Sequence, residues 1–292
     1  MQFPTGGKVR ERKALNRCNS DTDSIVWMEE EKGLTITSVR PEYILGRIFW
    51  RYGMKELFLQ LKENLQFVLV SGAIIVAIAL LAKLTERFLP ATRKATVARR
   101  VSIIGVCSAI AAVLHMLDFP LLFMAPSFYK LDFSELPVML CGFYLGPSAA
   151  VACEGVKILL KLLMKGTSTA FVGDFANFVV GCSLVFPATA IYHIKKSRQS
   201  ALWGLVIGTL VLTVFGSAFN GIYLLPKFSQ LFGLPLDSII AMGAAIHKGI
   251  SSVSTFVLLA VAPLNLLKGA VISLLTMLLY KRVARPLFGI RA

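Results

Sequence analysis

The sequence contains apolar runs that are long enough to cross a lipid bilayer. Residues 65–82 form one such run of 18 residues without a charged side chain. As a helix this run is about 27 Å long, close to the thickness of the hydrocarbon core. Of all residues 56% are hydrophobic and 16% charged, whereas about a quarter of the residues of soluble domains are charged. The sequence therefore predicts an all-α integral membrane protein and argues against a soluble domain.

The formal charge of +15 comes largely from short basic clusters that lie between apolar runs. The positive-inside rule places such clusters on the cytoplasmic side of the membrane, so the C-terminus is expected to be cytoplasmic. In a soluble domain the same charge would suggest nucleic-acid binding, which is not expected here. The clusters consist of Arg87, Arg93, Lys94, Arg99 and Arg100, of Lys195, Lys196 and Arg198, and of Lys281, Arg282, Arg285 and Arg291.

Composition divides the chain into six parts. The first is polar and mixed in charge, which is typical of a disordered tail. In the second, apolar residues recur at helical spacing among charges, which predicts an amphipathic interfacial helix, with a solvated linker helix as the alternative. The parts are the tail (1–42), the interfacial helix (43–64), an extra transmembrane helix (65–84), a basic cytoplasmic linker (85–100), a six-helix membrane domain (101–285) and a basic cytoplasmic tail (286–292).

Apolar runs and turn residues give the bounds of the six helices in the membrane domain. The second and third are short, and the Gly146-Pro147 turn between them carries no charge, so a re-entrant hairpin is an alternative for this pair. The six helices are expected at 101–124, about 134–146, 149–164, 170–192, 201–225 and about 252–280.

Lys268 is the most unusual of the polar residues in these apolar segments. It precedes Lys281 by 13 residues, about 20 Å of helix, which is too far for its ammonium group to reach the membrane surface. Asn265 lies on the same helix face, and Pro263 favours a kink that lines a cavity. Ionisable groups in such places are functional candidates. The alternative is a structural ion pair between Lys268 and Glu154 or Asp174.

Other polar residues fit structural roles as well as binding. Glu154 and Lys157 are three residues apart and are expected to neutralise each other on one helix face. The hydroxyls of Thr167 and Ser168 can cap the next helix and can also bind a ligand. Asp174 and Asn177 lie at the start of that helix and are secondary candidates for binding.

The sequence lacks the motifs of an enzyme or an ATPase. It contains no HExxH, GxSxG or glycine-rich nucleotide loop. Its five cysteines form no CxxC pair, and its three histidines are far apart, so no metal site is expected. The chain is therefore not expected to be an enzyme, to bind a cofactor or to drive transport with ATP by itself.

The first helix of the membrane domain carries small residues at a spacing that allows close helix contact. Gly105 and Ala109 are four residues apart, and so are Ser108 and Ala112. Such small-xxx-small faces pack tightly against other helices. The pattern is compatible with a partner protein and equally with packing inside the chain.

Five sequence blocks resemble the riboflavin-specific substrate-binding (S) components of energy-coupling factor transporters. The resemblance covers about residues 99–285. It implies a six-helix protein of the bacterial cell membrane that binds the vitamin from outside and has no ATPase. Its partners would be a transmembrane coupling protein and two cytoplasmic ATPases. The blocks are KLDFSELPVML (130–140), YLGPSAAV (144–151), KGTSTAFVGDFANFVVGCSLVFPATAIY (165–192), IAMGAAI (240–246) and PLNLLKG (263–269).

The resemblance also implies which residues bind riboflavin and the coupling protein. A carboxamide complements the N–H and carbonyl edge of a flavin ring, and an ammonium group donates to a ring carbonyl. Flavin mononucleotide is a further possible ligand. An S component for another vitamin is one alternative, and a transporter driven by an ion gradient, with Glu154, Lys157 and Asp174 as a proton relay, is another. The expected flavin contacts are Leu131, Asp132, Thr167, Ser168, Asn220, Asn265 and Lys268, and the expected partner contacts are Gly105, Ser108, Ala109 and Ala112.

Overall fold

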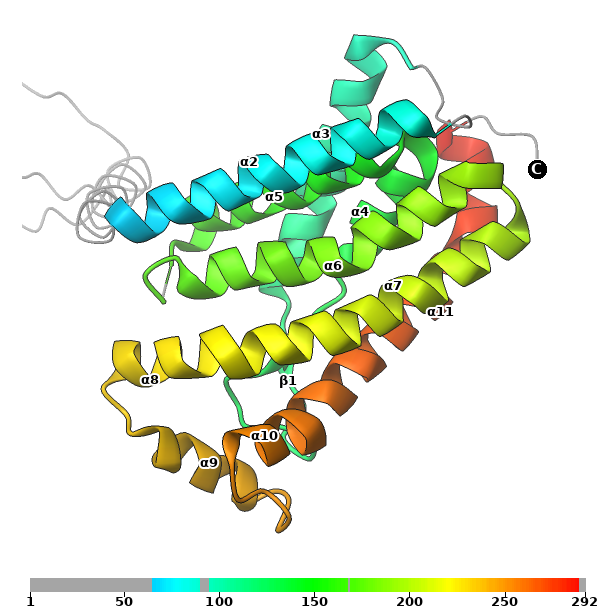
Figure 1. The fold of residues 1–292 in the computed structure, drawn as a ribbon. Coiled ribbons are helices and arrows are strands. Elements are labelled where there is room, and N and C mark those ends of the chain that lie inside the picture. The colour runs from blue at the N-terminus through cyan, green and yellow to red at the C-terminus, as the bar shows by residue number, and fades with distance from the viewer. Residues whose placement is uncertain (1–64, 90–94, 168, 289–292) are drawn as a thin grey trace, which may run out of the picture. The chain divides into compact units, whose positions relative to one another are not determined.

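The computed structural model describes residues 65–89, 95–167 and 169–288 (Figure 1). The predicted tail and interfacial helix, residues 1–64, lie outside the described residues, as do Ser168 and parts of the predicted linker and C-terminal tail. The described chain is helical except for loops and one short antiparallel pairing. In this pairing Phe119–Pro120 (β1) lies against Lys130–Leu131 (β2).

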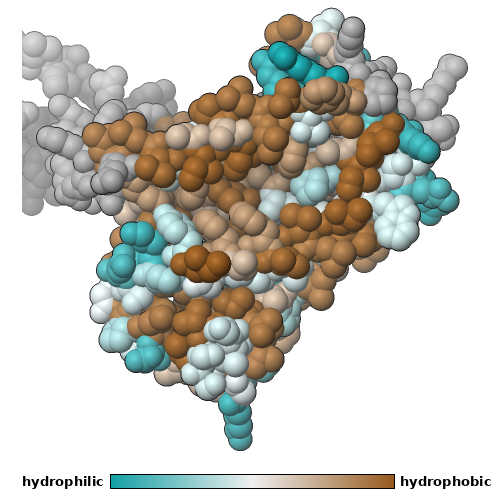
Figure 2. Space-filling view, viewed as in Figure 1, coloured by the Kyte–Doolittle hydropathy of each residue, from teal (hydrophilic) through white to brown (hydrophobic). Residues whose placement is uncertain are grey.

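Within the described residues, five helical stretches are long and apolar enough to cross a membrane, which confirms the all-helical membrane fold. On the face drawn in Figure 2, hydrophobic side chains cover much of the length of the long helices. Side chains such as Leu80 and Val214 are exposed on these helices, as expected for a membrane protein, because lipid takes the place of water around them. The helices that form these stretches are α2 (Leu65–Phe88), α3 (Val97–Met116), α6 (Val172–Lys195), α7 (Arg198–Phe219) with its continuation, and α11 (Ala262–Phe288) with the turns before it.

Two further helices form a tight hairpin inside the bundle. α4 (Glu135–Leu145) has 11 residues, about 16 Å of helix, less than the hydrocarbon thickness. Gly146 joins it to α5 (Pro147–Lys165) with a φ of 112°, where a side chain would cause strain. Pro147 suits the first helical turn because its missing N–H needs no partner there.

The core forms around α4, which packs against α3, α5, α6 and α11. Phe143 of α4 is buried and stacks on Tyr192 of α6, with ring centroids 4.5 Å apart, while Tyr280 of α11 meets it edge-on. Aromatic pairs of this kind stabilise a core beyond the area they bury. α4 is thereby fixed between α6 and α11, and its first turn becomes a rigid part of the polar region described below.

α2 packs on α5 and α6 and is tied to the bundle at its C-terminal end. Ala82 is fully buried there. The carboxylate of Glu86 accepts hydrogen bonds from Arg100 of α3, with an N–O distance of 3.3 Å, and from Ser148 of α5. α2 is therefore held against the other helices by an apolar face and by the hydrogen bonds of Glu86.

α3 is shorter than predicted. It ends at Met116 rather than at residue 124. Pro120 lacks an N–H and disfavours helical conformation at Phe119, so the chain turns and returns as β2. Lys130 pairs with Asp118 across this turn, with an N–O distance of 3.1 Å. The return carries residues 130–134 back to α3 and α4.

Two π-helical segments interrupt the long helices, and each ends two residues before a proline. η1 (Asn220–Leu224) joins α7 to α8 (Leu225–Phe232), and η2 (Val257–Val261) joins α10 (Val253–Phe256) to α11. Pro226 and Pro263 follow them, and the wider π turn relieves the clash between a proline ring and the preceding turn. The segments touch, since a Cβ at Gly221 would lie 2.9 Å from Val257. α9 (Leu236–Ala244) packs beside α8 and α10. The helix that begins as α7 continues through η1 and α8 to Phe232, and α11 runs to Phe288. The predicted helix ends at residues 225 and 280 are therefore too early.

Candidate functional site

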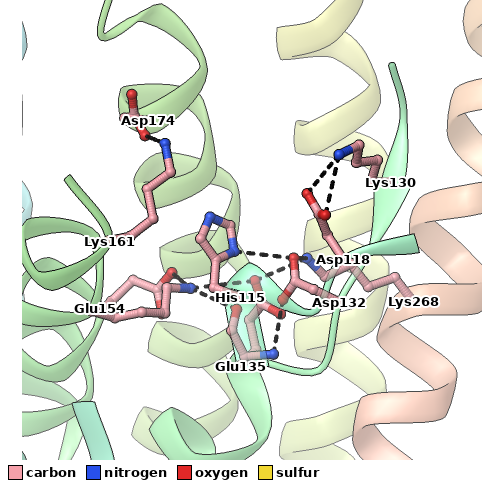
Figure 3. A network of polar contacts seen from close by, with 11 residues as sticks. His115, Asp118, Lys130, Asp132, Glu135, Glu154, Lys161, Asp174 and Lys268 are labelled. Carbon is pink, nitrogen blue, oxygen red and sulfur yellow. Dashed lines mark hydrogen bonds and ion pairs between the residues drawn. The ribbon is translucent and has the colours of Figure 1, made fainter. Parts of the chain in front are cut away.

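Asp132 is the centre of a buried polar cluster where the loop after β2 meets α3 and α11 (Figure 3). One carboxylate oxygen, Oδ2, lies 3.3 Å from His115 Nδ1 and 3.4 Å from Lys268 Nζ. The other, Oδ1, accepts a hydrogen bond of 2.8 Å from the backbone N–H of Ser134. A single side chain thus joins two helices and fixes the loop that leads into α4.

Lys268 has different ion-pair partners from those the sequence suggested. Its ammonium group lies 3.0 Å from Glu135 Oε1 and 3.4 Å from Asp132, whereas the structural alternative paired it with Glu154 or Asp174. The reason is the return of the chain through β2, which places Asp132 and the first turn of α4 beside α11. The Lys268 side chain is 13% exposed.

Glu154 and Lys157 form the predicted ion pair on α5, and the pair extends further. Lys157 also donates to Ser134 Oγ at 3.0 Å and lies 3.6 Å from Glu135. Both members of the pair are fully buried. The Asp132 and Lys157 groups therefore form one continuous network, which Figure 3 shows across α3, α4, α5 and α11.

Asp132 carries a charge in this environment. Burial by itself would raise the pKa of its carboxyl group, but Lys268, His115 and Lys157 outweigh burial and hold the pKa well below its ordinary value. Asp132 is therefore an ionised acceptor. At the nearby Tyr129, burial raises the pKa of the phenol. Its hydroxyl group donates a hydrogen bond of 3.1 Å to Asn220 Oδ1.

The two amides predicted to bind a ligand lie against the same turn of the chain. Asn220, at the start of η1, donates to the Gly216 carbonyl at 2.7 Å. Asn265 of α11 donates to Ser217 Oγ at 3.3 Å and packs on Gly216, where a Cβ would lie 3.1 Å from its amide nitrogen. Both amides are buried. The contacts of Tyr129 and of Lys268 link this pair to the loop of Asp132, in which Leu131 is also buried.

The predicted contacts at the start of α6 form a second polar group. Thr167 Oγ1 accepts a 3.0 Å hydrogen bond from the N–H of Phe171, the residue just before α6, so it orders the turn that leads into the helix and does not cap the helix itself. Asp174 pairs with Lys161 of α5 at 2.5 Å, and Lys161 also donates to the Gly166 carbonyl at 3.0 Å. Ser168 lies outside the described residues, and Asn177 is exposed on α6.

The four small residues of α3 lie on two different faces. Gly105 and Ala109 are exposed, and a Cβ at Gly105 would have no neighbour within 4 Å. Ser108 and Ala112 are buried, and the Ser108 hydroxyl donates to the Cys153 carbonyl of α5 at 3.2 Å. The prediction that Ser108 and Ala112 contact a partner is therefore corrected: they pack inside the chain.

The sequence did not indicate three residues of this region. Tyr129 and Glu135 flank the predicted LDF segment, and their roles depend on the unpredicted turn through β1 and β2. His115 was set aside because the histidines are far apart in the chain, and its partner is a carboxylate rather than a second histidine. Among the described residues, no group of three or more His, Cys, Asp or Glu side chains is placed to hold a metal ion.

Comparisons with known proteins find relatives of this chain. Residues 99–280 match the family model described as "ECF transporter, substrate-specific component". The riboflavin transporter RibU of Staphylococcus aureus is 37% identical over 186 residues, which are 64% of this chain and 90% of that protein. The riboflavin transporter FmnP of Bacillus subtilis is 28% identical over 183 residues, which are 62% and 90% of the two chains. A solved structure described as the S component of a bacterial ECF transporter is 36% identical, with a TM-score of 0.52, and covers 66% of this chain and 99% of that one.

Proposed function

The chain belongs to the substrate-specific components of energy-coupling factor transporters, and we propose that its substrate is riboflavin. Relatives from Staphylococcus aureus and Bacillus subtilis, each aligned over 90% of its length, are riboflavin transporters. Membership of this family means that the chain is a transporter component and not an enzyme. The blocks of sequence that match the family carry the polar residues of the buried site, so a shared ligand is the simplest explanation.

The observation that carries this proposal is the convergence of Asn220, Asn265 and Lys268 beside the Asp132 loop. Each amide offers donor and acceptor atoms that complement the N–H and carbonyl edge of the isoalloxazine ring. Asp132, as an ionised acceptor, suits the hydroxyls of the ribityl chain. Leu131 and the apolar side chains around η1 and η2 suit the dimethylbenzene end, since small-molecule sites are mostly apolar with few polar groups.

Transport requires partners in this proposal. A transmembrane coupling protein and two cytoplasmic ATPases would supply the energy, and the exposed Gly105 and Ala109 face of α3 is proposed to contact the coupling protein. The six helices α3, α4, α5, α6, α7 and α11 would form the substrate-binding domain, with the C-terminus in the cytoplasm as the basic clusters indicate. α2, which precedes the family match, would be an additional transmembrane helix.

Equilibrium titration of the purified full chain with riboflavin tests the proposal, with quenching of flavin fluorescence as the readout. We expect sub-micromolar affinity, and parallel titrations with flavin mononucleotide and with thiamine define the preference. If the chain bound another vitamin and not riboflavin, it would be a substrate-specific component for that vitamin.

Transport energetics need a separate experiment. Vesicles that contain only this chain should not accumulate riboflavin under a proton or sodium gradient, whereas the complex with its ATPases and ATP should. Accumulation driven by a gradient alone would support the ion-coupled alternative and contradict the partner model.

A further inference from the structure

The buried network that leads away from the proposed riboflavin site contains more carboxylates than ammonium groups. Its carboxylates are Asp132, Glu135 and Glu154, and its ammonium groups belong to Lys157 and Lys268. An uncompensated charge in a protein interior costs several kcal/mol, about as much as breaking a buried ion pair. The network therefore needs one further positive charge or one bound proton.

Burial increases along the network toward α5. The Lys268 side chain is 13% exposed, that of Glu135 is 4% exposed, and those of Lys157 and Glu154 are fully buried. A carboxylate at the exposed end can be solvated by water or a ligand, whereas one at the buried end cannot. The unbalanced charge is consequently most costly at Glu154.

Hydrogen bonding also singles out Glu154. Asp132 accepts from Ser134 N–H, from Lys268 and, with Nδ1 protonated, from His115. Glu154 faces only one ammonium group at hydrogen-bond distance, that of Lys157, which also serves Glu135 and Ser134. Its second oxygen, Oε2, is buried and has no hydrogen-bond partner among the described residues. The same is true of Glu135 Oε2, but Glu135 faces two ammonium groups, those of Lys157 and Lys268.

Among the described residues, the helices packed around Glu154 add no further cation at its carboxyl group. The charged groups that act on it are Lys157 on its own helix, Glu135 on α4 and Lys268 on α11, and the thiol of Cys182 on α6 interacts with it as well.

The surfaces that the other helices present toward α5 are closely packed or apolar. α6 presents Gly181, where a methyl group would clash with the Glu154 carboxyl group. The α2 side chains that pack on α5 and α6 include Ile75, Ile78 and Ala82, and the titratable side chain that α3 contributes to the network, His115, lies at its other end, on Asp132.

We propose that Glu154 is a proton-binding site and that its carboxyl group holds one proton in the folded membrane domain. With this proton in place, Lys157 balances Glu135 and Lys268 balances Asp132, so that the ionised carboxylates and the ammonium groups of the network are equal in number. The proton comes from the solvent when the domain folds, and no other bond is formed or broken. The proposal does not depend on which vitamin the chain binds.

Infrared spectroscopy of the purified full chain at neutral pH tests the proposal directly. The wild type should show the C=O stretching band of a protonated carboxylic acid that shifts in D2O, and Glu154→Gln should lack this band. Asp174→Asn is the matched control, because it neutralises a buried carboxylate that pairs with Lys161 outside this network, and it should retain the band. Absence of the band from the wild type, or its persistence in Glu154→Gln, would overturn the proposal.

Thermal unfolding of the same variants gives an independent readout. Glutamine is a neutral near-isostere of a protonated glutamic acid, so Glu154→Gln should leave the transition temperature unchanged. Asp174→Asn removes the charged partner of Lys161 and should lower the transition by several degrees. Equal losses in both variants would mean that Glu154 is ionised and would overturn the proposal. Since neither measurement uses riboflavin, failure here leaves the proposed function intact, and a failed riboflavin titration leaves this inference intact.

Discussion

Two polar regions lie inside this bundle, and they differ in the kind of group to which their polar side chains are bonded. The amides of Asn220 and Asn265 lie beside π-helical turns and make few hydrogen bonds for groups with two donors and two acceptor lone pairs. The pair of Glu154 and Lys157 is fully buried in regular helix and bonded mainly to other charged groups. Unused capacity indicates a place for a ligand, and mutual pairing indicates a scaffold.

Lys268 and Asp132 belong to both regions. Lys268 is three residues from Asn265 on α11, yet its ammonium group is bonded to Asp132 and Glu135 of the charged network. A ligand that reaches Lys268 therefore meets a side chain whose position is already fixed. Fixed polar groups lose little conformational entropy on binding, which favours affinity. The variants below separate the two regions, from the largest expected effect to the smallest.

Replacing Lys157 with methionine should have the largest effect on stability. The change leaves Glu135 with only Lys268 as a cationic partner and leaves Ser134 without its donor, and breaking a buried pair in this way costs about 3–5 kcal/mol. Thermal unfolding of the full chain in detergent measures the loss. Lys165→Met, at the exposed end of the same helix, is the matched control. Equal stability of the two variants would contradict a scaffold role for the network.

Lys268→Met should affect both binding and stability, because this side chain joins the two regions. The loss of a charged hydrogen bond to the flavin lowers affinity about 10- to 100-fold. Stability should fall less than in Lys157→Met, since Lys157 still faces Glu135 and His115 still faces Asp132. Titration with riboflavin and thermal unfolding measure the two effects. A variant with normal affinity would restrict Lys268 to the scaffold.

Asn265→Ala should weaken riboflavin binding and leave the fold intact. Its amide makes one long hydrogen bond within the chain, at 3.3 Å to Ser217, so its removal costs little stability. A lost pair of hydrogen bonds to the ligand is expected to lower affinity about tenfold or more. Gln199→Ala, at an exposed amide near the start of α7, is the control. If the variant lost as much free energy of unfolding as free energy of riboflavin binding, Asn265 would belong to the scaffold.

The sequence predicts much of this fold because membrane helices follow from local properties. Apolar length identifies α2, α3, α6, α7 and α11, and the glycine before Pro147 identifies the hairpin of α4 and α5. The structural alternative for Lys268 named the wrong ion-pair partners, because the observed partners depend on a turn at Pro120 that brings β2 back to α3 and α4. A pairing that is set by the path of a loop leaves no periodic pattern in the sequence.

The residues of the candidate site likewise divide into those that the sequence indicated and those that it did not. Asn220, Asn265 and Lys268 could be proposed from the cost of polar groups in lipid together with the family resemblance. His115, Tyr129 and Glu135 were missed, since histidine, tyrosine and glutamate near helix ends are common and carry no such signal. The two faces of α3 could not be separated either, because four small residues spaced by threes and fours fit either face until the neighbouring helix is known.

Substitutions on the exposed face of α3 should have the smallest effect on riboflavin binding. Gly105→Leu places a side chain in open space, and Ala109 is likewise exposed, so both variants should bind riboflavin with wild-type affinity. If this face contacts the coupling protein, the same variants should assemble poorly with it, because a bulky side chain blocks close helix approach. Titration with riboflavin and co-purification with the coupling protein and ATPases measure the two properties.

The buried face of the same helix provides the contrast. Ala112→Leu inserts a larger side chain into a packed core, which costs about 1–3 kcal/mol, and should lower stability before it affects assembly. His115 lies on this face and bonds to Asp132, so strain there is expected to reach the binding loop. Assembly that is lost only in Gly105→Leu and Ala109→Leu, with binding intact, would show that one helix serves the partner on one face and the ligand site on the other. Normal assembly of both variants would remove α3 from the partner interface and leave only its buried face with a function.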